Sequence, residues 1–203
     1  MKDGKRIGIM GGTFNPIHNG HLLLAQKALE QVVLDKVLFM PSGHSYMKKN
    51  VLETPKRVDM VALAIKKYPS FELSLIEAQK TGNTYTYETL LSLTASNPDT
   101  QYYFIIGADS LFQIEQWKNP EQIFQMAILV CAVREDYDFD AIRQKGNALA
   151  AFGANIIYLN MPPIDISSTD IRTKVKDNIS ILDLVPPEVA HYIEQEHLYY
   201  EKD

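Results

Sequence analysis

The chain has 203 residues, of which 46% are hydrophobic and 22% charged, as in ordinary globular proteins and unlike disordered or fibrous ones. Its formal net charge of −5 argues against a protein that binds nucleic acid through a general positive field. Cys131 is the sole cysteine, which excludes an intrachain disulfide framework and a multi-cysteine zinc site.

Apolar runs typical of buried strands alternate along the chain with segments whose apolar residues recur at helical spacing. The predicted strands are 6–10, 36–40, 71–76, 101–106, 127–133 and 155–159. The predicted helices are 22–34, one that follows Thr54 as N-cap with Pro55 in first position, 86–93, one that starts at Asn119-Pro120, 139–150 with Asp138 as cap, 167–176 and 187–197.

Strands separated by helices predict βαβ units, and hence a Rossmann-like, doubly wound, mostly parallel α/β sheet with helices on both faces. We find no linker and expect a single domain over 1–203, in which 165–203 forms a small C-terminal helical part. Ligands of such sheets bind beyond the carboxyl ends of the strands. This rule selects the segments 11–21, 41–50, 107–117, Arg134 and 162–172.

No part of the sequence predicts a membrane protein. The apolar stretch near the N-terminus is too short for a signal peptide. No apolar run reaches the length of about 18 residues that a spanning helix requires. We therefore expect a soluble, cytoplasmic protein with no membrane and no nucleic-acid partner.

The string GGTFNPIHNGH at 11–21 directly follows the first predicted strand. Gly11 and Gly12 let a ligand approach the backbone without obstruction by a Cβ atom. His18 and His21 are three residues apart at the start of a helix, so both rings can face one side. The N–H groups and the positive dipole end of a helix start favour phosphate. Together these features predict a polyphosphate site.

From the residues alone, other interpretations of this string stay open. The glycines could form a mere turn beside two surface histidines. The histidines could supply two zinc ligands, although no third ligand at helical spacing is evident. The string lacks the Gly-Lys-Ser/Thr ending of the Walker loop and does not fit the Gly-x-Gly-x-x-Gly dinucleotide fingerprint.

The end of the string, HNGH at 18–21, resembles the HxGH signature of the nucleotidyltransferase superfamily, which is similar to the HIGH motif of class I aminoacyl-tRNA synthetases. The whole string resembles bacterial nicotinate-mononucleotide adenylyltransferases more closely. The resemblance continues, in the family's order, through TYT at 84–86, GAD at 107–109 with Trp117 downstream, and ISSTDIR at 166–172. It implies transfer of AMP from ATP to nicotinate mononucleotide, giving deamido-NAD and pyrophosphate in NAD biosynthesis.

The implied chemistry fits this inventory of residues. The nucleophile is a phosphate oxygen of the mononucleotide, largely ionised at pH 7 because the second pKa of a phosphate monoester is about 6. No general base is needed. The enzyme must align two anions and stabilise charge on pyrophosphate. Positive donors, N–H groups and Mg²⁺ brought in with ATP are the tools for this, and we assign no metal-ligating residue.

The resemblance implies that His18, His21 and Arg172 are catalytic, with His21 the better candidate for transition-state stabilisation. The implied ATP contacts lie on three of the motifs: Gly11, Gly12, Thr13, Phe14, His18, His21, Gly107, Asp109, Ser167, Ser168 and Arg172. The hydroxyl and N–H groups of a helix start suit phosphate at 167–168. The alternatives are plain capping with a solvated arginine at 167–172, and a turn-forming aspartate at 109.

The implied contacts to nicotinate mononucleotide are spread along the chain: Asn15, Lys48, Thr84, Tyr85, Thr86, Trp117 and Arg134. The resemblance stacks Trp117 on the pyridine ring and places the nicotinate carboxylate on backbone N–H groups at 84–86. A carboxylate gains more at a helix start than a neutral amide does. Core packing is the alternative for Trp117, and ordinary N-capping by Thr84 or Thr86 is the alternative for that segment.

Two loops depart from the family's pattern. Where relatives carry Pro-Pro-His-Lys after the second strand, this chain has HSYMKK at 44–49, in which Lys48 is our candidate for the phosphate. Where many relatives carry Arg-Pro-Gly after the strand at 127–133, this chain has Arg-Glu-Asp at 134–136. These departures concern loop details rather than the reaction.

Two other functions stay open. Another HxGH transferase, for example one that uses phosphopantetheine, would keep the ATP residues but leave 84–86 and Trp117 without a purpose. A non-catalytic nucleotide-binding module is the second alternative, and the intact motifs argue against it. Relatives are often dimers or higher, so the resemblance also implies a homo-oligomer.

Overall fold

The computed structural model describes residues 4–43, 51–133, 138–163 and 165–200. Its elements in chain order are β1 (Lys5–Gly12), α1 (Asn19–Val32), β2 (Lys36–Pro41), α2 (Thr54–Ile65), β3 (Phe71–Leu73), α3 (Thr86–Ser96), β4 (Thr100–Gly107), α4 (Ala108–Gln113), the 3-10 helix η1 (Ile114–Gln116), α5 (Pro120–Met126), β5 (Ala127–Val133), α6 (Phe139–Ala150), β6 (Ile156–Asn160), α7 (Ser168–Lys176) and α8 (Pro187–Gln195). In these described segments no helix combines the length and apolar character needed to cross a membrane.

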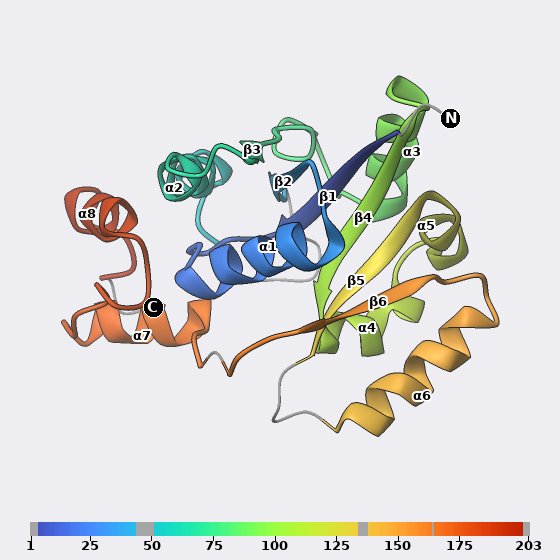
Figure 1. The fold of residues 1–203 in the computed structure, drawn as a ribbon. Helices are drawn as coiled ribbons and strands as arrows, with labels where there is room; N and C mark the ends of the chain where they lie inside the picture. Colours follow the sequence, from blue (N-terminus) through green and yellow to red (C-terminus); the bar gives the residue numbers. More distant parts are fainter. Residues whose placement is uncertain (1–3, 44–50, 134–137, 164, 201–203) are drawn as a thin grey trace.

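The strands form one parallel sheet in the order β3-β2-β1-β4-β5-β6 (Figure 1). The chain builds outward from β1 to β3, returns to place β4 beside β1, and then builds outward in the other direction. This arrangement confirms the Rossmann-like, doubly wound sheet predicted from the sequence. The strand order reverses between β1 and β4, and open parallel sheets bind ligands at the carboxyl ends of the strands at such a point.

Helices cover both faces of the sheet, and successive strand residues alternate between two hydrophobic clusters. In β1, for example, Ile9 belongs to one cluster and Met10 to the other. Buried residues of α3, α4, α5 and α6 complete the Ile9 cluster. Buried residues of α1, α2, α7 and α8 complete the Met10 cluster, so the C-terminal helices share their apolar contacts with the sheet and with α1.

The predicted elements lie close to the observed ones, with three corrections. The predicted strand 71–76 ends at Leu73, because the chain turns at 76–79, where Gln79 donates its N–H to the Leu75 carbonyl (3.0 Å). The segment after β4, for which we predicted no element, forms α4 and η1. Thr54 is the first residue of α2 rather than its N-cap, which is Glu53.

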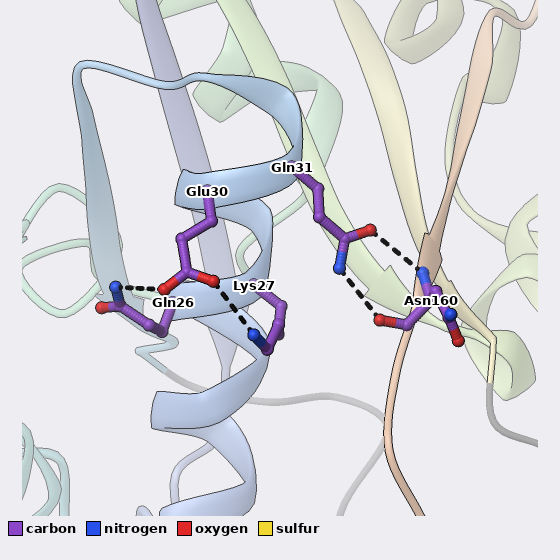
Figure 2. A network of polar contacts seen from close by, with 5 residues as sticks. All are labelled: Gln26, Lys27, Glu30, Gln31 and Asn160. Atoms are coloured by element: carbon purple, nitrogen blue, oxygen red, sulfur yellow. Dashed lines mark hydrogen bonds and ion pairs between the residues drawn. The ribbon is translucent and has the colours of Figure 1, made fainter.

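A side chain of α1 covers part of the edge strand β6. Gln31 donates from Nε2 to the Asn160 carbonyl (2.9 Å) and accepts at Oε1 from the Asn160 N–H (3.2 Å), as Figure 2 shows. The preceding residue, Glu30, accepts from Gln26 (2.9 Å) and Lys27 (3.0 Å), which lie one turn earlier in α1. The Gln31 amide thus supplies the donor and acceptor that a further strand would offer, which protects this end of the edge from pairing with another chain.

Val33 closes α1 in the left-handed conformation (φ 54°, ψ 57°) with 72% of the residue exposed. This conformation crowds a β-branched side chain against the backbone. We therefore expect Val33→Gly to raise the free energy of unfolding by about 1 kcal/mol, as measured by urea denaturation. Val33→Ala keeps the Cβ atom and should raise the free energy of unfolding by less. A glycine variant less stable than the wild type would contradict this explanation.

Candidate active site

The carboxyl ends of β1 and β4 both finish in glycine. Gly107 has an ordinary backbone (φ −83°), yet a Cβ built on it would meet no atom within 4 Å. A Cβ on Gly11 would lie 3.7 Å from the Phe104 ring, at ordinary contact distance. Neither backbone conformation nor packing therefore requires glycine at 107, and the open space beside it suits a ligand that approaches the backbone at the switch point.

The two histidines of the HxGH string lie on one side of the helix start, as predicted, and their rings stack on one another. Their ring centroids are 3.7 Å apart with 29° between the planes. The backbone N–H of His18 donates to His21 Nδ1 (3.2 Å). A neutral imidazole that accepts at Nδ1 carries its proton on Nε2. This bond and the edge-on contact with Phe14 orient the ring of the half-buried His21.

His18 is buried, with 7% of the residue exposed. Burial lowers its pKa from 6.5 to about 4, so the ring is neutral at pH 7. Its Nδ1 atom is buried and has no hydrogen-bond partner within the described residues. A neutral His18 avoids charge repulsion with the ring stacked on it, and a polyphosphate bound nearby would raise its pKa.

The loop that joins β1 to α1 is held by side chains from three distant parts of the chain. Arg57 of α2 donates to the Thr13 carbonyl (2.7 Å), and Arg172 of α7 donates to the Asn15 carbonyl (2.8 Å). Ser168 donates to the Pro16 carbonyl (2.9 Å), and Tyr199 donates to Asn15 Oδ1 (2.9 Å). These four contacts place the backbone of 13–16, and hence the start of α1.

Arg57 is a residue of this site that the sequence analysis missed. The side chain is 1% exposed, and its other partners are the carbonyls of Leu52 (2.8 Å), Ser42 (2.8 Å) and Gly43 (3.1 Å) and the Thr54 hydroxyl (2.9 Å). Burial lowers the pKa of the guanidinium, which still stays charged at neutral pH. One cation therefore ties the loops after β1 and β2 together.

A signal for Arg57 was present in the sequence. It is buried on one stripe of α2 together with Met60, Val61 and Ala64, at helical spacing. A charged residue on an apolar stripe must find several hydrogen-bond partners in the core, because an uncompensated buried charge is very unfavourable.

The segment 166–172 lies against the loop between β1 and α1, but its side chains bind other groups of the protein. Ser167 is the N-cap of α7, accepting from the Asp170 N–H (3.1 Å) and donating to the Asp170 carboxylate (2.6 Å), so the capping alternative holds for this residue. Ser168 and Arg172 bind carbonyls of the first loop. The donors that remain for phosphate here include the first N–H groups of α7.

The side chain of Phe14, a residue that we predict to contact ATP, lies in the core. The residue is 2% exposed, and its ring packs edge-on against His21, with 5.1 Å between centroids, and 6.0 Å from the Phe39 ring. Phe14 supports His21 from behind.

A second group of predicted residues gathers around the start of α3. Tyr85 is the N-cap of α3 and makes no side-chain capping bond, so neither Thr84 nor Thr86 is the cap and the capping alternative is wrong. Lys118 lies with its Nζ 4.1 Å from the Tyr85 ring centroid. Its neighbour Trp117 is half-buried and meets Phe104 edge-on at 6.0 Å.

The structure thus brings the segment 84–86 and the residues after η1 to one place. The start of α3 has no side-chain cap, and Lys118, whose ammonium group contacts the Tyr85 ring, also pairs with Glu88 in the first turn of α3 (3.8 Å). Trp117 precedes Lys118 in the chain and packs against the same hydrophobic cluster as Tyr87 of α3. Such an arrangement can bind an aromatic carboxylate through the ring, the N–H groups and the positive charge.

The remaining predicted residues have no settled role. Asp109 is exposed in the first turn of α4. Lys48 and Arg134 lie outside the described residues.

Across the described ranges, no group of three or more His, Cys, Asp or Glu side chains could hold a metal ion. A hollow of about 810 Å³ at the amino ends of β1 and β4, lined partly by Arg6, Asp35 and Tyr103, lies far from this chemistry.

Comparisons with known proteins agree with this geometry. The cytidylyltransferase-like family matches residues 9–174. The chain is 43% identical to a protein of Lachnoclostridium phytofermentans and 42% identical to one of Clostridium tetani, each described as a probable nicotinate-nucleotide adenylyltransferase. Each match covers 96% of this chain and 99% of the relative.

Solved structures share the fold. The nicotinic acid mononucleotide adenylyltransferase of Plasmodium falciparum, complexed with NaAD, matches with a TM-score of 0.80 at 22% identity, covering 96% of this chain and 97% of that one. The same protein complexed with APC matches with a TM-score of 0.77 at 20% identity, over the same shares of the two chains. At these identities the likeness concerns the fold alone.

The buried His18 makes stability depend on pH. Its pKa is about 4 when folded and 6.5 when unfolded, so between these values the unfolded chain binds more protons. The stability is present above pH 6.5 and is lost as the pH falls towards 4. From pH 7 to pH 5, His18 should account for a loss of about 2 kcal/mol.

Between pH 7 and pH 5, the free energy of unfolding should fall by about 2 kcal/mol less in His18→Gln than in the wild type. Urea unfolding at both pH values measures this difference. His191→Gln, at an exposed position, is the matched control and should behave as the wild type. Equal losses in the wild type and His18→Gln would show that burial does not hold this ring neutral.

Proposed function

The chain belongs to the nicotinate-nucleotide adenylyltransferases of the cytidylyltransferase-like family, and on this premise we propose that it transfers AMP from ATP to nicotinate mononucleotide, releasing pyrophosphate and giving nicotinate adenine dinucleotide. The observation that carries the proposal is the stacked pair His18 and His21 at the start of α1, below the glycine end of β1. This pair stands at the switch point of the sheet, where the fold binds ligands.

The ATP phosphates bind over the start of α1. His21 donates its Nε2–H to the phosphates and stabilises charge on the leaving pyrophosphate. The first N–H groups of α1 and α7 add fixed donors. Gly11, Gly12 and Gly107 let the nucleotide lie against the ends of β1 and β4. Arg172 of α7 links the two phosphate-binding elements, because it donates to the Asn15 carbonyl in the loop before α1 as well as to the Thr169 hydroxyl of α7.

The acceptor binds on the other side of the switch point. Trp117 stacks on the pyridine ring, and the N–H groups at the start of α3 bind the carboxylate with help from Lys118. The acceptor's phosphate oxygen then attacks the α-phosphorus of ATP while the bond to pyrophosphate breaks. Asn15, Lys48 and Arg134 are the proposed ligands of the acceptor's phosphate.

Mg²⁺ enters as part of the ATP substrate. No acidic or histidine cluster in the described ranges could hold the ion by itself. The triphosphate oxygens are hard ligands of the kind that Mg²⁺ prefers, and the ion reduces the repulsion between the two anionic substrates.

We also propose that residues 1–203 act as one domain, since the hydrophobic cluster of α1 and α2 includes residues of α7 and α8. A cytoplasmic location and a homo-oligomer, expected from the family resemblance, remain predictions. Sedimentation of the purified protein measures the oligomeric state.

The experiment that tests the function is an acceptor panel. The protein is incubated with ATP, Mg²⁺ and either nicotinate mononucleotide, nicotinamide mononucleotide or phosphopantetheine, and pyrophosphate release is measured. We expect the fastest turnover with nicotinate mononucleotide. Preference for phosphopantetheine would establish another transferase of the superfamily, and ATP binding without pyrophosphate release for any acceptor would establish a non-catalytic module.

His21→Ala should lower kcat by about 10²-fold or more, because one donor to the transition state is lost. Steady-state kinetics with saturating ATP and nicotinate mononucleotide measure this effect. His191→Ala, in the exposed part of α8, is the matched control and should keep wild-type kcat. Near-normal turnover in His21→Ala would remove this residue from the reaction.

Trp117→Ala should raise the KM for nicotinate mononucleotide and leave the KM for ATP almost unchanged. The expected rise in this KM is about 10-fold, because a lost aromatic stacking contact costs roughly 1.4 kcal/mol of binding free energy. Titration of each substrate with the other in excess separates the two constants. Equal losses for both substrates would assign Trp117 to packing against Phe104 alone.

A further inference from the structure

The end of the chain returns to the first loop of the sheet. After α8, His197 adopts a left-handed conformation (φ 50°) that reverses the chain, and Leu198 donates its N–H to the Ile193 carbonyl (3.0 Å). Leu198 is 7% exposed and belongs to the cluster of α1 and α2. Figure 1 shows the chain after α8 running back towards α7, on the same side as the start of α1. We call residues 196–200 the C-terminal hook.

The hook is fixed to α2 through the helix before it. Tyr192 of α8 donates its hydroxyl to the Asp59 carboxylate of α2 (2.9 Å). Lys56 of α2 forms an ion pair with Glu196 at the start of the hook. α2 also carries Arg57, which binds the first loop directly. The hook therefore has a support that does not depend on its own contact with the site.

That contact is one hydrogen bond, from the Tyr199 hydroxyl to Asn15 Oδ1 (2.9 Å). The same oxygen accepts a longer bond from the Leu52 N–H (3.4 Å). Because two donors converge on one terminal atom of the Asn15 amide, this atom must be the oxygen. The other terminal atom is therefore the nitrogen, whose NH₂ group carries two donors.

The Tyr199 hydroxyl stays a donor throughout the neutral range. Burial raises the pKa of its phenol above the usual value, and the nearby charges of Arg172 and Arg57 offset only part of this effect. Asn15 itself is 7% exposed, so water has little access to exchange with this bond.

We propose that Tyr199 is a positioning residue for the acceptor nucleotide, which orients the Asn15 amide so that its NH₂ group faces the acceptor's phosphate. This inference rests on the proposed function, in which Asn15 is a ligand of that phosphate. An amide in the opposite orientation would present an oxygen to an anion and repel it. The C-terminal hook thus sets a donor in the substrate site from about 180 residues along the chain.

The test uses Tyr199→Phe in the full-length enzyme, which removes only the hydroxyl. We expect the KM for nicotinate mononucleotide to rise about 3- to 10-fold, the value of one hydrogen bond, with the KM for ATP and the melting temperature close to the wild type. Tyr200→Phe, one residue further along the hook, is the matched control and should leave both KM values unchanged.

A double-mutant cycle separates positioning from general support. In an Asn15→Ala background the amide is absent, so Tyr199→Phe should add no further rise in the KM for nicotinate mononucleotide. Additive effects of the two substitutions, or equal rises in both KM values, would overturn the proposal. Failure of the acceptor panel would instead appear in the wild type, so the two proposals fail in different measurements.

Discussion

The whole site depends on how the irregular loop between β1 and α1 satisfies its carbonyl oxygens. Thr13, Asn15 and Pro16 lie outside any helix or strand, and buried carbonyls without partners are strongly unfavourable. Side chains of α2 and α7 supply the missing donors, chiefly through Arg57 and Arg172. The conformation of the loop therefore depends on α2 and α7, two separate parts of the chain that close on it. The positions of His18 and His21 follow from it.

Electrostatics at this loop are local. The chain carries a net charge of −5, so it cannot attract polyphosphates by its overall field. The positive potential comes from the start of α1, whose first turn carries no acidic residue, and from the buried Arg57 guanidinium, whose described partners are carbonyl and hydroxyl groups. His18 is neutral through burial, which lets it stack on His21 without repulsion. An anionic ligand thus meets fixed dipoles rather than mobile surface charges.

Much of this arrangement could be predicted from the sequence, because it depends on local patterns. The strands follow from their apolar runs, and the HxGH string and the segments 84–86 and 166–172 lie where parallel strands or helix starts place them. What could not be predicted depends on contacts between distant residues. Tyr199 on a terminal segment gives no periodic signal that links it to Asn15. Sequence alone also does not show that the Phe14 ring turns into the core.

The most direct test of this account is a crystal structure of the protein with a non-hydrolysable ATP analogue and Mg²⁺. The account predicts phosphate oxygens within about 2.7–3.2 Å of His21 Nε2 and of the first N–H groups of α1. A triphosphate bound away from the start of α1, for example in the hollow beside Arg6 at the amino ends of the strands, would contradict it.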